Sequence, residues 1–430
     1  MAQSPSEFAV RRTQPPAAPG LASETWASAG PSIPSPQKHR IESHPKTDVC
    51  IVGGGPAGLA CAIAAALRGL HVQVIDAAKP PIDKACGEGL MPDTLAALAR
   101  LGVHLDDSTG HPLHGIRFLD ADPAPSAPAA PTATAQASFP SPGRGVSRLL
   151  LHQRLLDRAT ELGVGLHWQT HVTSIAQPSE AIEQGAATIL HTSRGPLETR
   201  FLIGADGHQS RVRAWTGLDR AILSARRIGL RQHFAIAPWT GFVEVYWSPH
   251  GQAYVTPVSP HEVCVAFIAR TKFPSVAAAL ACFPQLQARL AAAPPSDTPR
   301  GAITLSRKLH RVTHGNIALV GDASGSVDAV TGEGLSLCFR QALALADALV
   351  ANDLARYQQA HTALCRLPHR MAATLLLLDR SPRLRAQIFA RFARQPQLFA
   401  HLLRVHIGDE PLRLFGRSGL LATGLHLLAA

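Results

Sequence analysis

"TDVCIVGGGPAGLACAIAAALRGLHVQVID", residues 47–76, decides the fold. An apolar run of strand length meets a glycine-rich turn, an alanine-rich helical stretch follows, and a second short strand closes the unit. The glycines have the spacing Gly53-x-Gly55-x-x-Gly58. Gly53 permits the tight turn, Gly55 lets the backbone approach a pyrophosphate, and Gly58 lets the helix pack closely on the strand. Asp76 ends the second strand, where a carboxylate can accept hydrogen bonds from ribose hydroxyls. The stretch therefore predicts a dinucleotide-binding βαβ unit.

Length, composition and charge limit the number of domains and the kinds of partner that this chain can have. The chain has 430 residues, 46% of them hydrophobic, so it can bury a large core and form two to three domains. Its formal net charge is +11, with many of the arginines scattered along 366–417. A basic excess can indicate an anionic partner or serve solubility. Because no nucleic-acid-binding motif accompanies it, we expect no nucleic-acid partner.

The cysteines give no sign of a metal site. The seven of them form no CxxC pair and have no Cys/His metal spacing, so we expect no bound metal. An odd count without an apolar leader favours a reducing cytoplasm. No window reaches about 18 consecutive apolar residues, so we expect no membrane span.

The remaining chain divides into segments of different character. Residues 1–46 and 120–145 are rich in Pro, Ser and Ala, and are predicted to be a disordered leader and a disordered surface insertion. Successive strand patterns over 227–269 predict a mostly antiparallel sheet. From 351 onward the pattern is helical.

Two further motifs indicate which dinucleotide binds. One strand pattern ends in Asp206-Gly207, and another ends in Gly321-Asp322 and opens through a glycine-rich turn onto a long helix. An NAD site needs only the first βαβ unit, so these later motifs favour a longer ligand. Asp322 is suited to accept a hydrogen bond from a polyol such as ribityl. The amides around 332–334 could stabilise negative charge on a flavin ring.

With these three motifs in this order, residues 47–350 resemble the FAD-dependent monooxygenase group typified by p-hydroxybenzoate hydroxylase, whose relatives include geranylgeranyl reductases and flavin-dependent halogenases. The resemblance implies bound FAD and an α/β fold, with a Rossmann-like ββα FAD-binding domain, an antiparallel-sheet substrate domain and C-terminal helices. The implied boundaries are 47–220 with 305–350 for the FAD-binding domain, 221–304 for the substrate-domain sheet and 351–430 for the helical region.

The resemblance also implies roles for matching positions. The ADP half is assigned to Gly53, Gly55, Pro56, Ala57, Gly58 and Asp76, with Arg148 approaching FAD and the Val172 backbone beside adenine. Asp206 and Gly207 are assigned to the pyrophosphate, Asp322 to the ribityl chain, and Gly332, Gly334 and Leu335 to the flavin ring. No second GxGxxG motif is present for a stably bound nicotinamide, which fits a group in which NAD(P)H is a transient electron donor or a separate reductase delivers the electrons.

Departures from the aromatic hydroxylases place the chain nearer one branch of the group. The forms "GDASG" at 321–325 and "TGEG" at 331–334, with "KACGEGL" at 84–90, look more like the geranylgeranyl reductases. The WxWxIP signature of halogenases is absent. Cys86 is a candidate catalytic residue beside the flavin, or a small residue in a tight loop. Glu88 is the weaker candidate, because glutamates in loops are mostly solvated.

Polar residues alternate along the predicted substrate sheet. Period two places Arg231 and His233 on one face, and Glu244, Tyr246 and Tyr254 alternate along the neighbouring strands. One face of this sheet is expected to line a pocket. Ordinary polar residues on its outer face are the alternative for each of these side chains.

The predicted function is that of an FAD-dependent oxidoreductase using NAD(P)H. Monooxygenation of an aromatic or polyketide-like small molecule with O2 is favoured. The alternatives are reduction of C=C bonds in a prenyl or lipid substrate, and flavin binding without turnover. We expect a cytoplasmic protein with no stable protein partner. Peripheral membrane contact through the arginine-rich C-terminal helices stays open as an alternative.

Overall fold

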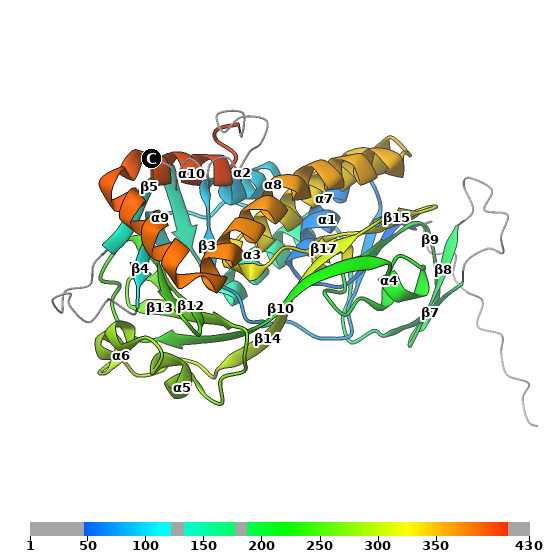
Figure 1. Cartoon of the computed structure of the whole chain (residues 1–430). Coiled ribbons are helices and arrows are strands. Elements are labelled where there is room, and N and C mark those ends of the chain that lie inside the picture. The colour runs from blue at the N-terminus through cyan, green and yellow to red at the C-terminus, as the bar shows by residue number, and fades with distance from the viewer. Residues whose placement is uncertain (1–46, 122–132, 177–186, 412–430) are drawn as a thin grey trace, which may run out of the picture. The chain divides into compact units, whose positions relative to one another are not determined.

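The computed structural model describes residues 47–121, 133–176 and 187–411. The predicted disordered leader, 1–46, lies outside these residues, as does the end of the predicted helical region, 412–430. Two sheets and the helices packed on them make up the described part of the chain (Figure 1).

The first sheet grows around β1 (Thr47–Val52), the strand that precedes the glycine-rich turn. Its neighbours β2 (Val72–Ile75) and β9 (Gly195–Gly204) both run parallel to it. The outer strands are β6 (Gly165–His167), β7 (Val172–Ala176), β8 (Thr188–Thr192), β15 (Thr313–His314) and β16 (Ile317–Leu319). The order is β15-β16-β9-β1-β2-β6, with β8 also paired to β9 and β7 paired to β8.

Helix α1 (Pro56–Ala66) and helix α7 (Gly334–Val350) pack against each other beside this sheet. Alanine and glycine dominate α1, and nine of its residues are buried. Small side chains let the helix approach its neighbours closely, and an apolar surface on all sides is typical of a buried helix. The other helices of this region are α2 (Pro92–Arg100), α3 (Arg148–Glu161) and α4 (Arg211–Trp215). The predicted Rossmann-like ββα unit is confirmed.

The second sheet is mostly antiparallel, as predicted. Its strands are β3 (Gly89–Leu90), β4 (His111–Asp120), β5 (Ala133–Gly145), β10 (Ala221–Phe234), β11 (Phe242–Ser248), β12 (Gly251–Ser259), β13 (Glu262–Ala269), β14 (Arg300–Leu309) and β17 (Gly325–Ser326). The order is β17-β14-β10-β13-β12-β11-β4-β5-β3, and β11 with β4 is a parallel pair. The sheet therefore takes strands from outside 221–304, the range predicted to supply it.

Strand β5 corrects the prediction that 120–145 is a disordered insertion. Residues 122–132 lie outside the described part, but 133–145 pair with β4. Ala135, Ala137 and Phe139 are buried, and the residues between them are exposed. This period-two pattern is that of a half-buried strand, and a composition rich in small residues and proline concealed it.

The two faces of the second sheet are covered by different helices. Val245 and Trp247 of β11 pack with the C-terminal helices, whereas Tyr246 between them packs with the short helices on the opposite face. The C-terminal helices are α8 (Leu354–Arg380), α9 (Pro382–Arg394) and α10 (Pro396–His406), drawn in orange to red in Figure 1. The short ones are α5 (Val276–Leu280) and α6 (Pro284–Leu290). The helical prediction for the C-terminal region holds over the described residues.

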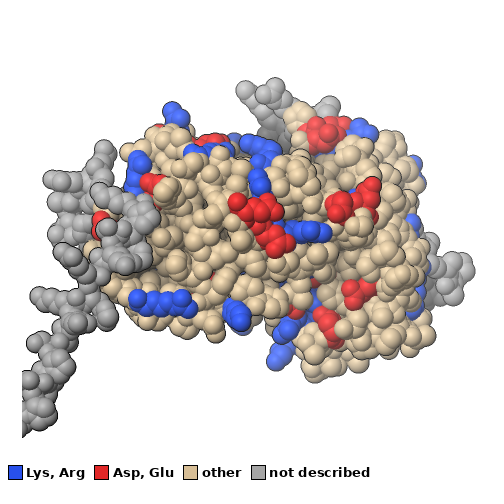
Figure 2. Space-filling model, turned by 180° about the vertical axis from the view of Figure 1, so that it is seen from behind, with Lys and Arg blue, Asp and Glu red and all other residues tan. Residues whose placement is uncertain are grey.

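Surface charge and helix length bear on the predicted partners. On the face shown in Figure 2, basic side chains are interspersed with acidic ones and do not gather in a single patch. Across the described residues, every helix is too short or too polar to cross a membrane. Membrane contact through the C-terminal helices stays a prediction.

Candidate functional site

The glycine-rich turn between β1 and α1 has three glycines in three different environments. Gly53 has φ +114°, a conformation that favours glycine. A Cβ on Gly58 would lie 1.8 Å from the carbonyl oxygen of Gly53, so only glycine allows this contact of helix and strand. A Cβ on Gly55 would meet nothing within 4 Å. The open side of the turn at Gly55 is where the backbone can approach a ligand.

Asp76 holds the turn in place. Its carboxylate accepts hydrogen bonds from the backbone N–H of Gly54 at 2.6 Å and of Ala78 at 2.7 Å. Nε2 of His152 lies 2.9 Å from the carbonyl oxygen of Gly54. Carboxylate lone pairs remain beyond these two bonds, so the predicted contact with ribose hydroxyls is compatible with the geometry.

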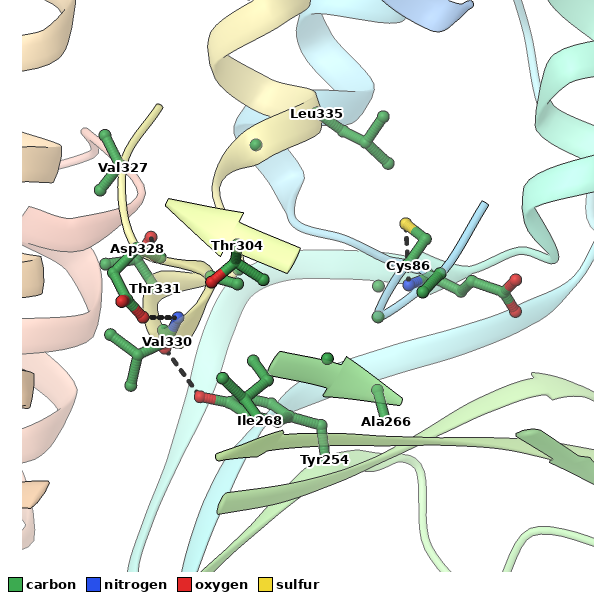
Figure 3. Close-up of a pocket in the computed structure, with 18 of the residues that line it drawn as sticks. Cys86, Tyr254, Ala266, Ile268, Thr304, Val327, Asp328, Val330, Thr331 and Leu335 are labelled. Carbon is green, nitrogen blue, oxygen red and sulfur yellow. Dashed lines mark hydrogen bonds between the residues drawn. The ribbon is translucent and has the colours of Figure 1, made fainter. Parts of the chain in front are cut away.

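Beside the turn lies a cavity of about 410 Å³. It is bordered by the turn, by the loops at 84–89 and 321–335, by one face of the second sheet and by α8 and α10. Figure 3 shows Cys86 and Asp328 on loops at opposite sides, with Tyr254 and Ile268 reaching up from the sheet. A volume of this size is within the range of small-molecule sites.

The walls away from the loops are apolar. They are formed by Leu113, Ile116, Phe118, Phe139, Val243, Val245, Met371, Leu375, Phe399, Leu402 and Leu403. The strands contribute one face of the sheet, and the helices contribute residues at helical spacing. The cavity thus has a polar end at the loops and an apolar body between sheet and helices.

The tetrapeptide GEGL occurs at 87–90 and again at 332–335, and both stretches border this one cavity. Gly87, Glu88 and Gly89 line it from one loop, and Gly332 and Gly334 line it from the other. Gly332 is left-handed, with φ +70°, and a Cβ on Gly332 or Gly334 would meet nothing within 4 Å. Because Gly334 begins α7, the positive end of that helix lies at the cavity. Two glycine-lined loops from distant parts of the chain therefore meet at this cavity.

Each GEGL glutamate points inward and lies near a histidine from a distant element. Glu88 is 2% exposed, and its Oε2 lies 2.6 Å from Nε2 of His233. Glu333 is 3% exposed, and its Oε2 lies 3.7 Å from Nδ1 of His406. Burial raises the pKa of Glu333. The expectation that Glu88 is solvated was wrong, because its carboxylate is buried against His233 and the backbone N–H of Arg148.

Glu88 also connects the first loop to helix α3. Its Oε1 accepts a hydrogen bond from the backbone N–H of Arg148 at 2.9 Å. Arg148 lines the cavity, and its Nε has no hydrogen-bond partner among the described residues. A half-buried guanidinium whose buried Nε has no partner is suited to an anionic ligand. This geometry fits the predicted approach of Arg148 to FAD.

His233 lies in a buried network of charges. Its Nδ1 is 2.9 Å from Asp297, and Arg231 forms ion pairs with Asp297 and, at 2.7 Å, with Asp83. Burial alone would lower the pKa of His233, but the hydrogen bond and charge of Glu88, with Asp297, raise it to about 8. The prediction that Arg231 and His233 share one face is confirmed, since their side-chain nitrogens are 2.7 Å apart.

Cys264 lies beside this network. One ligand atom each of Glu88, His233 and Cys264 falls within 4.8 Å of the others. Glu88 and His233 already satisfy each other, however, and burial raises the pKa of the Cys264 thiol. The group is therefore explained as an ion pair beside a neutral thiol.

The other polar residues of the sheet divide between its faces. Tyr254 lines the cavity and donates a hydrogen bond to the carbonyl oxygen of Val330 at 2.9 Å. Tyr246 donates to Glu244 at 2.8 Å, and Glu244 pairs with Arg117 at 2.9 Å. Glu244 and Tyr246 do not line the cavity. Only Tyr254 of these three belongs to the site.

Cys86 lies where the first loop borders the cavity. Its Sγ is 3.5 Å from the backbone nitrogen of Glu88. Burial raises the pKa of its thiol, although Arg148 opposes this shift. Cys86 is thus a neutral thiol at the cavity wall, and its predicted catalytic role stays a prediction.

The remaining predicted cofactor residues differ in how they meet the cavity. Pro56, Ala57, Gly207, Asp322 and Leu335 line it. The Asp206 carboxylate instead accepts hydrogen bonds from Ser210 and from backbone N–H groups at the start of α4, so it orders the loop that carries Gly207. Val172 lies at the start of β7, in the core of the first sheet and outside the cavity lining.

The residues present fit FAD. The open side of Gly55, the unsatisfied Arg148 guanidinium and the N-terminus of α1 suit a pyrophosphate. Asp322 borders the cavity between that end and the α7 N-terminus, which suits a hydroxyl-bearing chain and a ring that carries negative charge. Sequence reasoning named Glu88 only as the weaker candidate and missed His406, because only the fold pairs these residues with their partners.

Comparison with known proteins agrees with this fit. A family model described as an FAD binding domain matches residues 46–356. The chain is 28% identical over 342 residues to the menaquinone reductase of Mycolicibacterium smegmatis, covering 73% of this chain and 79% of that one. It is 27% identical over 327 residues to the FAD-dependent urate hydroxylase of Klebsiella oxytoca, covering 71% and 80%. The fold is similar to that of a flavoprotein/dehydrogenase from Cytophaga hutchinsonii, with a TM-score of 0.72, 17% identity, and coverage of 89% and 99%.

Proposed function

The chain belongs to the family defined by this FAD binding domain, within the p-hydroxybenzoate hydroxylase-like group, and we propose that this FAD-dependent oxidoreductase is a monooxygenase. It uses NAD(P)H and O2 on an aromatic or polyketide-like small molecule with a large apolar part. NAD(P)H supplies two electrons, one oxygen atom enters the substrate, and the other leaves as water.

The observation that carries this proposal is the two-part cavity. Flavin-binding loops form one end of it, and apolar side chains of the sheet and the C-terminal helices form the rest. A polar metabolite would leave these walls poorly matched, whereas an apolar ring or chain would bury against them. The same walls exclude water from the reacting groups, which suppresses the release of hydrogen peroxide in place of substrate oxygenation.

The chain's own residues bind and orient the reactants. Arg148 and the N-termini of α1 and α7 hold negative charge, and Asp322 accepts hydrogen bonds from hydroxyl groups. When bound, FAD supplies hydride acceptance and oxygen activation. Glu88 keeps the first loop against the cavity through its contacts with Arg148 and His233.

A reductase is the second candidate, and Cys86 favours it. Saturating a C=C bond needs a hydride and a proton, and a neutral thiol at the cavity wall is a suitable proton donor. The similarity to a protein named menaquinone reductase supports the same candidate. A flavin-binding protein without turnover is the third candidate, and the cavity of about 410 Å³ disfavours it because side chains do not fill the substrate end.

Isotope labelling separates these candidates. The FAD-loaded protein is mixed with NADPH and ¹⁸O2 in the presence of a long-chain alkylphenol or menaquinone as the probe. The monooxygenase predicts one ¹⁸O atom in the alkylphenol product and no turnover without oxygen. A menaquinone product that gains two hydrogens in its prenyl chain, and not only at the quinone ring, under anaerobic conditions would instead establish the reductase. The absence of any product with flavin still oxidised would support the third candidate.

A further inference from the structure

A second cavity, of about 420 Å³, lies on the other side of the 321–334 loop. Its walls are β14, β17, the start of α7 and one stripe of α8. The α8 residues on it recur at helical spacing, from Gln358 to Ala373, so a single face of that helix borders it.

The charged side chains that line this cavity are nearly all basic. Arg307, Lys308, Arg366 and Arg370 line it, and Asp322 is its one acidic residue. Lys308, Arg366 and Arg370 form no ion pair within the described residues, and Arg366 and Arg370 are exposed. Basic groups left unpaired around a cavity concentrate an anion there.

Arg307 adds an unsatisfied donor to this set. One guanidinium nitrogen donates to the carbonyl oxygen of His208 at 3.0 Å, and its Nε has no hydrogen-bond partner among the described residues. Its side chain is 14% exposed. Buried polar atoms are seldom left without a partner, so this donor is suited to a ligand oxygen.

The second cavity reaches the flavin-binding loop. Gly321, Asp322, Gly334 and Cys338 line both cavities. A ligand whose charged end rests on the α8 arginines could therefore place its other end against the loop that borders the first cavity. NADPH has this form, with a 2′-phosphate on its adenosine end, a pyrophosphate in the middle and the hydride-carrying nicotinamide ring at the other end.

We propose that the second cavity binds the phosphate groups of the nicotinamide donor and selects NADPH over NADH. The extra 2′-phosphate of NADPH needs additional cations, and the α8 arginines supply them. The chain has no second GxGxxG motif for a stably bound nicotinamide, so side-chain cations are required to take the place of a glycine-rich phosphate loop. This inference rests on the proposed use of NAD(P)H.

The test uses the FAD-loaded full chain. The variant Arg366→Ala/Arg370→Ala is compared with Arg380→Ala, which removes an exposed arginine from the same helix outside the cavity. Two readouts are taken, the KM for NADPH in flavin reduction and the binding of 2′,5′-ADP by calorimetry. We expect the double variant to raise the KM for NADPH by about tenfold or more, which is about 1.4 kcal/mol, with kcat and FAD content unchanged. The KM for NADH should rise less, and added salt should raise the wild-type KM for NADPH.

Two results would overturn the inference. One is a KM for NADPH and a 2′,5′-ADP affinity that stay within about twofold of wild type in the double variant. The other is a changed KM for the alkylphenol or menaquinone probe with NADPH unaffected, which would assign the cavity to an anionic group of the substrate. A different result is expected if the proposed function itself is wrong. NADPH would then leave the wild-type flavin oxidised, and 2′,5′-ADP binding would still decide whether the arginines hold the phosphates.

Discussion

Glu88 and His233 stand 145 positions apart in the chain, yet Oε2 of one lies 2.6 Å from Nε2 of the other. The contact joins the loop that carries Cys86 to strand β10 of the second sheet. Through its other oxygen Glu88 also holds the first backbone N–H of α3. The pair therefore fixes the first loop between helix α3 and the second sheet.

This pair makes stability depend on pH. The pKa of His233 is raised to about 8, from an ordinary value of about 6.5. A raised pKa contributes stability that is fully present below about pH 6.5 and is lost as the pH rises through about 8. We expect the free energy of unfolding to fall by about 2 kcal/mol across this window. Urea unfolding between pH 6 and 9 measures it.

The variant Glu88→Gln is the control for that assignment. It removes the negative charge while keeping an acceptor, so the pKa of His233 should fall and the pH dependence should flatten. Equal slopes in the variant and the wild type would show that other groups cause the dependence.

A pair of glycine substitutions separates binding from folding. Gly55→Ala adds a Cβ that meets nothing within 4 Å, so the protein should fold normally but bind FAD poorly. Gly58→Ala places a Cβ 1.8 Å from the carbonyl oxygen of Gly53, so it should destabilise the fold by several kcal/mol. Thermal unfolding and the flavin content after purification distinguish the two. Full FAD occupancy in Gly55→Ala would refute the pyrophosphate assignment.

Asp322 is expected to hold FAD through the hydroxyls of its chain. Asp322→Ala should lower FAD occupancy, with a loss of about 1–3 kcal/mol of binding free energy for a charged acceptor. Asp206→Ala is a useful contrast, because that carboxylate caps α4 and its loss should appear mainly in thermal stability. Retention of all FAD in Asp322→Ala would contradict the assignment.

Cys86 should behave as a protonated thiol. Because burial raises its pKa, iodoacetamide should modify Cys86 slowly at pH 7. Cys86→Ala should leave flavin reduction by NADPH unchanged, and it should lower product formation only if a C=C bond is reduced. Rapid alkylation in the folded protein would contradict the neutral thiol.

The sequence predicted most of the fold around its glycine motif. The β1–α1–β2 unit, the antiparallel sheet and the C-terminal helices follow from period and glycine spacing, which are local properties. Strand β5 was missed because alanine and proline hide a period-two pattern that shows only when Ala135 and Phe139 are seen to be buried. Low-complexity composition is thus a poor sign of disorder when every second residue is small or apolar.

The roles of the glycines in the site could be predicted from the sequence. The partners of its charged side chains could not. Gly53, Gly55 and Gly58 act through the backbone, so their roles follow from spacing. The partners of Glu88 and Glu333 come from β10 and α10, and a single sequence gives no information about such long-range pairs. The basic cavity was hidden for the same reason, since β14 and α8 meet only in the fold.

Anaerobic mixing of the FAD-loaded protein with NADPH tests the central claim most directly. The account predicts that the visible absorption band of the bound flavin bleaches, and that oxygen then restores it with product formed when the apolar probe is present. A flavin that NADPH leaves oxidised, or a purified protein that binds no FAD, would contradict the account.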